Sequence, residues 1–141
     1  MATLIAPELI IPNGVTDISF YEKAFGAVER FVLRNDDGSV HVAELAIDEA
    51  LFHIHEISRP DHMRAPDGKV TAIIGLFVDD VEAVVTKAAA AGATLKTPVT
   101  DHEYGYRQAM VEDPFGHRWQ IQKIYDNALR SAFIEKAAET R

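Results

Sequence analysis

An internal repeat constrains the fold of this chain more than any other feature of its sequence. Asn13 and Asp80 each precede an apolar pattern with helical spacing, and they lie 67 positions apart. Gly-Ala pairs end the two patterns at Gly26 and Gly92, which lie 66 positions apart. Strand patterns come before and after each helix, so the order of elements repeats as well. We therefore expect two copies of one β-α-β-β-β unit.

The first unit is predicted over residues 3–56. Its first strand is expected over residues 4–11, where Pro7 indicates a sheet edge or the start of the strand. Apolar residues at helical spacing predict a helix over residues 15–25, which Gly26 ends. Strands are expected over residues 28–34, 40–47 and 51–56, and residues 35–39 form a hairpin turn between the first two.

The second unit is predicted over residues 70–124, after a polar connection over residues 57–69 that contains two prolines. A strand over residues 70–78 leads to a helix that Asp79-Asp80 caps and Gly92 ends. Strands are expected over residues 93–99, 104–111 and 118–124, the last two joined by the tight turn 113–116. A final amphipathic helix over residues 126–140 is expected to dock on the outside or on a partner chain. We treat residues 1–141 as one domain.

Composition excludes several classes of partner. The net charge is −8, and an acidic protein lacks the basic face that nucleic acids or anionic membranes require. The chain has no cysteine, so it has no disulfide, no thiolate metal site and no cysteine nucleophile. No signal-peptide pattern or membrane-length apolar run is evident. We expect a cytoplasmic protein whose partner is a small molecule, with neither nucleic acid nor membrane as a partner.

Four motifs in order resemble the vicinal oxygen chelate superfamily, which includes glyoxalase I, extradiol dioxygenases and bleomycin-resistance proteins. They are Phe20-Tyr-Glu-Lys-Ala-Phe-Gly26, Val78-Asp-Asp-Val81, Ala90-Ala-Gly92 and Asp113-Pro-Phe-Gly-His-Arg-Trp119. The last motif, with Gly105-Tyr-Arg107 before it, is most similar to the PhnB-like branch. The resemblance implies an α+β fold, in which two tandem βαβββ modules form curved mixed sheets around a cleft with the helices outside. It also implies a homodimer and a cleft that often holds a divalent metal ion.

The resemblance places metal ligands in the first and last strands of each module. Carried over one at a time, the first-strand positions fall on Ala6 and Ile73, and the last-strand position of the second module falls on Gln120. The last strand of the first module gives His53 or His55. Alanine and isoleucine bind no metal, and a glutamine carbonyl is a poor ligand for a transition metal. The resemblance therefore supports the fold and argues against the usual metal, and we expect no cofactor.

His53 and His55 are the sharpest local signal for chemistry. Two histidines at i and i+2 on a strand point to one face and can share a metal, if Glu8 or Glu44 supplies a third ligand. The alternative is that both line a polar cleft or a solvated face. His41 is either a ligand contact or a half-buried histidine bonded to a neighbour, and strand periodicity puts it on the opposite face from Glu44 unless a bulge intervenes.

Two further residues complete the predicted ligand-binding set. Gln120 could orient a polar ligand, or it is a solvated strand residue. Arg107 could clamp a carboxylate or phosphate, or it forms a surface ion pair. By contrast, Trp119 is expected in the core, and Asp113 is expected to bond the backbone of its own turn. His117, in the same turn, is expected to be structural or exposed.

The leading hypothesis is a protein that binds or sequesters a small ligand in a cleft that has lost the usual metal ligands. The alternative is a divalent-metal-dependent lyase, isomerase or dioxygenase with a shifted site at His53 and His55. A third interpretation is a metal-free enzyme that uses His41 or His53 as general base. The sequence assigns no catalytic residue and does not decide whether the protein is an enzyme.

Overall fold

The computed structural model describes residues 1–140 and contains the predicted repeat of elements. The first unit consists of β1 (Glu8–Ile11), α1 (Phe20–Phe25), β2 (Val28–Arg34), β3 (Val40–Ile47) and β4 (Ala50–Glu56). The second consists of β5 (Ile73–Phe77), α2 (Val81–Ala90), β6 (Thr94–Asp101), β7 (Tyr106–Glu112) and β8 (Arg118–Ile124). The helix α3 (Asn127–Glu139) follows them.

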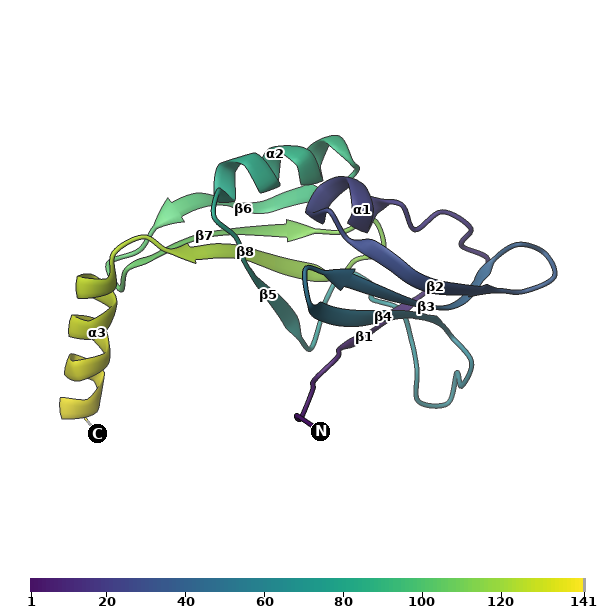
Figure 1. The fold of residues 1–141 in the computed structure, drawn as a ribbon, viewed down its shortest axis with the longest axis horizontal. Helices are drawn as coiled ribbons and strands as arrows, with labels where there is room; N and C mark the ends of the chain where they lie inside the picture. The colour runs from purple at the N-terminus through teal and green to yellow at the C-terminus, as the bar shows by residue number, and fades with distance from the viewer. Residues whose placement is uncertain (141) are drawn as a thin grey trace.

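Each unit forms one four-stranded mixed sheet, and the two sheets have the same topology. The strand order is β1-β4-β3-β2 in sheet A and β5-β8-β7-β6 in sheet B. In each sheet the first strand pairs in parallel with the last strand, and the other pairs are antiparallel. Figure 1 shows α1 and α2 side by side above the two sheets, which leaves the lower side of the strands free of these helices. The predicted α+β class and tandem βαβββ organisation are confirmed.

Three elements begin three or more residues later than the sequence pattern predicts. β1 starts at Glu8 instead of residue 4, because Pro7 has no N–H to donate and contributes only its carbonyl, which accepts from His53 N at 2.8 Å. α1 starts at Phe20 instead of residue 15, because the Asp17 carboxylate accepts from Ser19 N at 2.8 Å and holds the preceding residues in a turn. β5 starts at Ile73 instead of residue 70.

The predicted helix ends are largely correct. Gly26 follows α1 with φ +69°, the left-handed conformation that glycine adopts without steric cost. The Asp80 carboxylate accepts from Ala83 N at 3.0 Å and caps α2. α2 ends one residue before its predicted stop, since its C-cap is Ala91.

A buried carboxylate joins the two units. Asp113 Oδ2 accepts from the Tyr21 hydroxyl at 2.6 Å and from Trp119 Nε1 at 3.0 Å. Asp113 Oδ1 accepts from the backbone N–H groups of Phe115 and His117, so the predicted bonding of Asp113 within its own turn is confirmed. Tyr21 and Trp119 are almost completely buried, which confirms Trp119 as a core residue. Burial, and then the nearby charge of Asp113, raise the pKa of the Tyr21 hydroxyl well above its usual value.

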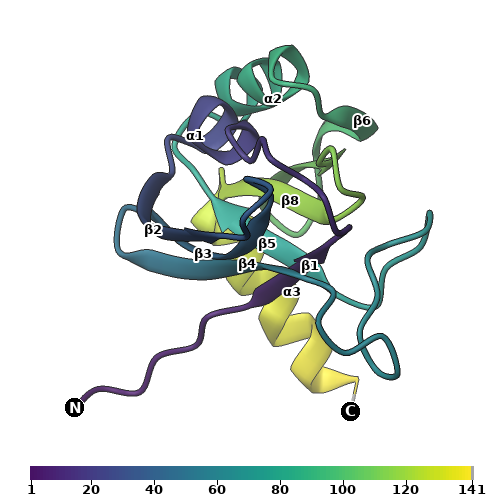
Figure 2. The ribbon, with the colours of Figure 1, turned by 90° about the vertical axis from the view of Figure 1, so that its right-hand side faces the viewer.

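Helix α3 is fixed at its first turn and projects away from the sheets. Tyr125 N and Asp126 N donate to the carbonyl of Gly105, and a side chain at Gly105 would place Cβ 2.4 Å from Asp126 O. Glycine is therefore required for this close approach. No residue within 127–139 is buried, and Figure 2 shows α3 leading downward, away from α1 and α2. Within the described residues, no helix has the length and apolar character needed to cross a membrane.

Candidate functional site

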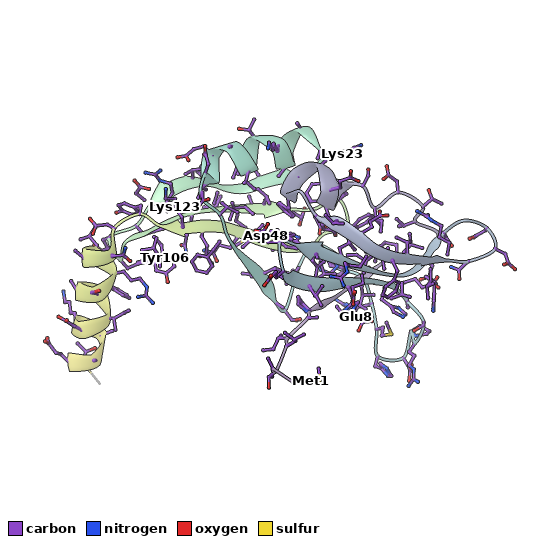
Figure 3. The ribbon with its side chains drawn as sticks, in the orientation of Figure 1. Met1, Glu8, Lys23, Asp48, Tyr106 and Lys123 are labelled. Atoms are coloured by element: carbon purple, nitrogen blue, oxygen red, sulfur yellow. The ribbon has the colours of Figure 1, made fainter. Side chains whose placement is uncertain are left out.

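The two sheets each present one face that α1 and α2 do not cover, and we call these the open faces. The open face of sheet A carries Glu8, Ile10, Phe31, Leu33, Val42, Glu44, His53 and His55. The open face of sheet B carries Ile73, Gly75, Phe77, Tyr106, Gln108, Met110, Gln120 and Gln122. Figure 3 shows Glu8 and Tyr106 on this lower side of the strands, with Tyr106 next to the start of α3.

His53 lies at the centre of an ionisable row on the open face of sheet A. It pairs with Glu8 on β1 and with Glu44 on β3, so both carboxylate residues lie directly beside it on the neighbouring strands. His53 Nε2 lies 3.1 Å from Glu44 Oε1. About a quarter of the His53 side chain is exposed, which leaves the imidazole accessible to a small molecule. A partly exposed histidine beside a carboxylate can exchange hydrogen bonds with a small polar ligand.

His41 and His55 form a second cluster at the end of the same strands. The register of β2 with β3 shifts between Leu33 and Arg34, and this irregularity leaves His41 without a partner on β2. The His41 ring centre lies 5.1 Å from that of His55, and His41 Nδ1 lies 2.6 Å from Glu56 Oε2. The hydrogen bond with His41 lowers the pKa of the Glu56 carboxyl, although partial desolvation opposes this effect.

The open face of sheet B carries neutral amides where sheet A carries histidines. By strand register, Gln120 corresponds to His53, and Gln122 corresponds to His55. Gly75 lies beside Gln120, at the place that Glu8 occupies beside His53. The same register places Met110 where sheet A has Glu44. The repeat therefore has an ionisable row at His53 in sheet A and a neutral row at Gln120 in sheet B.

The donor set of the chain does not fit the metal that the superfamily resemblance implies. Register places Glu8 and Gly75, rather than Ala6 and Ile73, beside the last-strand positions His53 and Gln120. Ala6 precedes β1, so the prediction that this residue lies in the first strand is wrong. Glycine offers no side-chain ligand and glutamine a weak one, so these two positions of sheet B contribute no good donor. Within residues 1–140, no group of three His, Asp or Glu side chains converges closely enough to hold an ion.

Arg107 lies apart from the other predicted site residues. It forms a two-point interaction with Asp101, at 2.6 and 3.1 Å, and Arg107 Nη1 lies 3.4 Å from Glu82 on α2. These contacts place its side chain on the α2 side of sheet B, opposite Gln120. The hydrogen bond with Asp101 raises the pKa of Arg107 and lowers that of Asp101. Of the two alternatives for Arg107, the structure contains the surface ion pair.

Two hollows lie where the units meet, at positions the sequence did not indicate. The larger, of about 680 Å³, lies between Phe25 at the end of α1, Asp48 in the β3–β4 turn and Phe77 at the end of β5. The smaller, of about 250 Å³, lies between β1, the connection before β5 and the start of β8. His117 borders it, and His117 Nε2 bonds to Ile10 O at 2.7 Å, so its predicted structural role is confirmed. Neither hollow is lined by the five predicted binding residues.

Two contacts of the site were not located by the sequence analysis, and one of them follows from a local pattern. The pairing of His53 with Glu44 follows from the tight turn between β3 and β4, which fixes the register of a hairpin. The pairing of Gly75 with Gln120 depends on a parallel contact between strands far apart in sequence, and no local pattern specifies it. Gln122 was not predicted as a site residue, because its place in the polar alternation of β8 does not distinguish it.

Comparison with known sequences identifies a family and related proteins. The model of the family described as "Glyoxalase/Bleomycin resistance protein/Dioxygenase superfamily" matches residues 16–121. The chain is 32% identical over 122 residues to "Uncharacterized protein Rv0887c" of Mycobacterium tuberculosis (strain ATCC 25618 / H37Rv). The alignment covers 83% of this chain and 72% of that protein.

Solved structures share the fold. The gene product of Arabidopsis thaliana At5g48480 is 28% identical with a TM-score of 0.69, and the match covers 87% of this chain and 100% of that one. A mutant of the genomically encoded fosfomycin resistance protein FosX of Listeria monocytogenes, complexed with Mn(II) and 1S,2S-dihydroxypropylphosphonic acid, gives a TM-score of 0.70. That match covers 95% of this chain and 98% of FosX at 14% identity, which is a likeness of fold alone.

Proposed function

This chain belongs to the glyoxalase/bleomycin resistance protein/dioxygenase superfamily, and on that basis we propose that it binds or sequesters a small organic molecule without the usual metal ion. The contrast between the open faces carries this proposal. Sheet A offers His53 between two carboxylates, whereas sheet B offers Gln120 beside Gly75 and Met110. A few polar groups on an apolar face are typical of small-molecule sites. We also propose that the chain belongs to the PhnB-like branch of this superfamily.

We propose His53, His55 and Gln120 as the ligand-contacting core, with His41 at its edge. His41 and His55 lie in ring contact, and His53 is two residues from His55 on the same face. Arg107 would join a site only after breaking its bonds with Asp101 and Glu82, so we expect its replacement by Ala to leave ligand binding unchanged.

We further propose that the protein acts as a homodimer in the cytoplasm, with the open faces completed by a second copy. The accessible surface of the chain is 8840 Å², whereas a compact monomer of this mass has about 7,250 Å². The excess of about 1,600 Å² exceeds the ~800 Å² that each partner buries in an ordinary interface. Val28, Phe31 and Leu33 on β2 supply exposed apolar side chains. Sedimentation velocity tests this proposal, and a monomer at micromolar concentration would refute it.

Elemental mass spectrometry of the purified protein tests the metal-free proposal. The measurement is made as purified and after dialysis against Zn, Ni, Fe and Mn. We expect no stoichiometric metal, together with thermal stabilisation by members of a small-molecule screen and no turnover of the stabilising compounds. Turnover that requires added metal would overturn the proposal.

A second candidate is a metal-dependent lyase, isomerase or dioxygenase with its site at His53 and His55. The observation that favours it is the 3.1 Å contact between His53 and Glu44, with Glu8 on the other side. A divalent ion there would polarise vicinal oxygens of a substrate. Since no three donors of the described chain converge, we derive no reaction step from it. Replacing both histidines with Ala should abolish metal binding and activity together, and full activity in that variant would exclude this candidate.

A further inference from the structure

All three glutamines of the chain lie on the open face of sheet B. Gln120 and Gln122 alternate with the buried Trp119 and Ile121 along β8, and Gln108 pairs with Gln122 from β7. Glutamine is otherwise absent from the 141 residues. An amide both donates and accepts hydrogen bonds without carrying charge. Their gathering on one face marks it as a neutral polar surface.

Two of these amides belong to a directed chain of hydrogen bonds. The Tyr104 hydroxyl donates to Gln108 Oε1 at 2.8 Å, and Gln108 Nε2 donates to Gln122 Oε1 at 2.8 Å. Each bond uses the oxygen of the next amide, so the chain fixes the orientation of the Gln122 side chain. The last donor of the chain is Gln122 Nε2. Gln122 is 9% exposed, and no buried side-chain nitrogen within residues 1–140 lacks a hydrogen-bond partner, so this donor reaches solvent at the open face. Hydrogen bonds in such chains polarise one another and strengthen the terminal donor.

Gly75 provides the space that this donor occupies. A Cβ atom built on Gly75 would lie 2.8 Å from Gln122 Nε2, closer than real side chains approach. Gly75 itself is exposed on the open face, so the region above it can be reached from solvent. Gln120 pairs directly with Gly75 and carries a second amide two residues from Gln122. An acceptor entering above Gly75 would meet two amide side chains.

The side chains around this point are apolar or aromatic. Phe77 is 59% exposed, and its ring centre lies 6.2 Å from that of Tyr106. Met110 lies opposite Gln120 on β7. The next row of the face contains Arg118 and Glu112, which bond to each other at 3.0 Å.

Arg130 of α3 also approaches this face, and its Nε donates to the Tyr106 hydroxyl at 3.2 Å. The rows that contain Gly75 and Phe77 carry no charged side chain. A charged ligand would lose its hydration in these rows, and the cations at their margin are already bonded, Arg118 to Glu112 and Arg130 to the Tyr106 hydroxyl.

We propose that Gln120, Gln122 and Gly75 form a recognition site for the carbonyl of an uncharged planar ligand, whose flat surface packs on Phe77 and Tyr106. The inference deepens the proposed function and rests on it, because it assigns a ligand class to one wall of the same site. The neutral amides take the place in the second unit that His53 and its carboxylates take in the first. The ligand is selected by hydrogen bonding and stacking rather than by ion pairing.

Side-chain NMR of the 15N-labelled protein tests this inference, because three glutamines give few amide signals to assign. The probes are benzamide, benzoate, benzylamine and ethylbenzene, which share a ring and differ in charge and acceptor. We expect benzamide to shift the Gln122 and Gln120 side-chain signals and to bind at least tenfold more tightly than the other three. Tighter or equal binding of benzoate or benzylamine would overturn the inference.

Matched variants locate the effect. Gln122→Met removes the donor at similar size, and Gly75→Ala displaces the amide, so each should weaken benzamide binding at least tenfold. Ile73→Ala, two residues from Gly75 on the same open face, should leave binding unchanged. Circular dichroism melts establish that each variant is folded. Unchanged benzamide binding by Gln122→Met would overturn this inference, yet other ligands found in the screen would still support the proposed function.

Discussion

Replacing Tyr21 with Phe should destabilise the protein through the loss of a single hydroxyl. The ring contacts of Tyr21 with Phe52 and Trp119 are retained, so the change isolates the 2.6 Å bond to Asp113. A hydrogen bond to a charged group contributes about 1.5–3 kcal/mol to stability. Asp113 keeps its bonds from Trp119 and two backbone N–H groups, so we expect a loss of about 2 kcal/mol in the free energy of unfolding.

The expected loss is large enough to measure by calorimetry or circular dichroism. A domain of this length has an unfolding entropy of about 0.3 kcal/mol/K, so about 2 kcal/mol lowers Tm by about 7 °C. Tyr125→Phe is the matched control, because its hydroxyl donates to His102 O at 2.9 Å from a half-exposed position and should cost less than about 1 kcal/mol. A Tm within about 1 °C of the unmodified protein, or an equal loss in the control, would refute the role of the buried bond.

Alkaline titration tests the burial of the same hydroxyl and its closeness to the charge of Asp113. The pKa of Tyr21 is raised in the folded state, so its contribution to stability is present below the unfolded pKa of about 10 and is lost as pH rises through the folded pKa. The tyrosinate absorbance of Tyr21, taken as the difference between the protein and Tyr21→Phe, should develop well above pH 10. Tyr21→Phe should make the stability less sensitive to pH above about 10. Development of that difference absorbance at or below about pH 10 in the folded protein would contradict this assignment.

Three smaller perturbations test other parts of the structure. Asp80→Ala removes the cap of α2 and should cost about 1 kcal/mol, seen as a lower urea midpoint, whereas no change would show that the cap is dispensable. His41→Ala should reduce the loss of stability between about pH 5 and 3. The lowered pKa of Glu56 contributes to the stability of the folded protein above the unfolded-state pKa, and this contribution is lost as pH falls through the folded-state pKa. An unchanged acid profile would mean that the pair does not form. Phe31→Lys should shift the proposed dimer toward monomer in sedimentation velocity, while the monomer keeps its Tm. An undisturbed dimer would place the interface elsewhere.

Local periodicity was sufficient for the order of the elements. β2, β3 and β8 have the predicted bounds, because alternation of apolar residues and the intervening turns act within a few residues. The predicted start of α1 was wrong, because the Asp17 side chain bonds to the backbone of Ser19 and competes with helix formation.

The candidate site was less predictable because its contacts are long-range. The bond between Tyr21 and Asp113 joins residues 92 positions apart, and no pattern in either segment specifies it. Arg107 forms an ion pair with Glu82 on α2, and strand periodicity alone did not predict this partner. The amide chain on sheet B requires the parallel pairing of β5 with β8 together with the absence of a side chain at Gly75. Such sites depend on how the sheet is assembled and not on one segment.

The packing of α1 against the second unit has a consequence for synthesis on the ribosome. The Phe25 ring lies 4.7 Å from that of Trp119, centre to centre, so one side of an early helix completes its contacts with a late strand. At 5–20 residues per second, roughly 5–20 s separate the translation of these two residues. During that interval the aromatic side of α1 remains without its final partner. Co-translational folding of the first unit is therefore incomplete until β8 has left the exit tunnel.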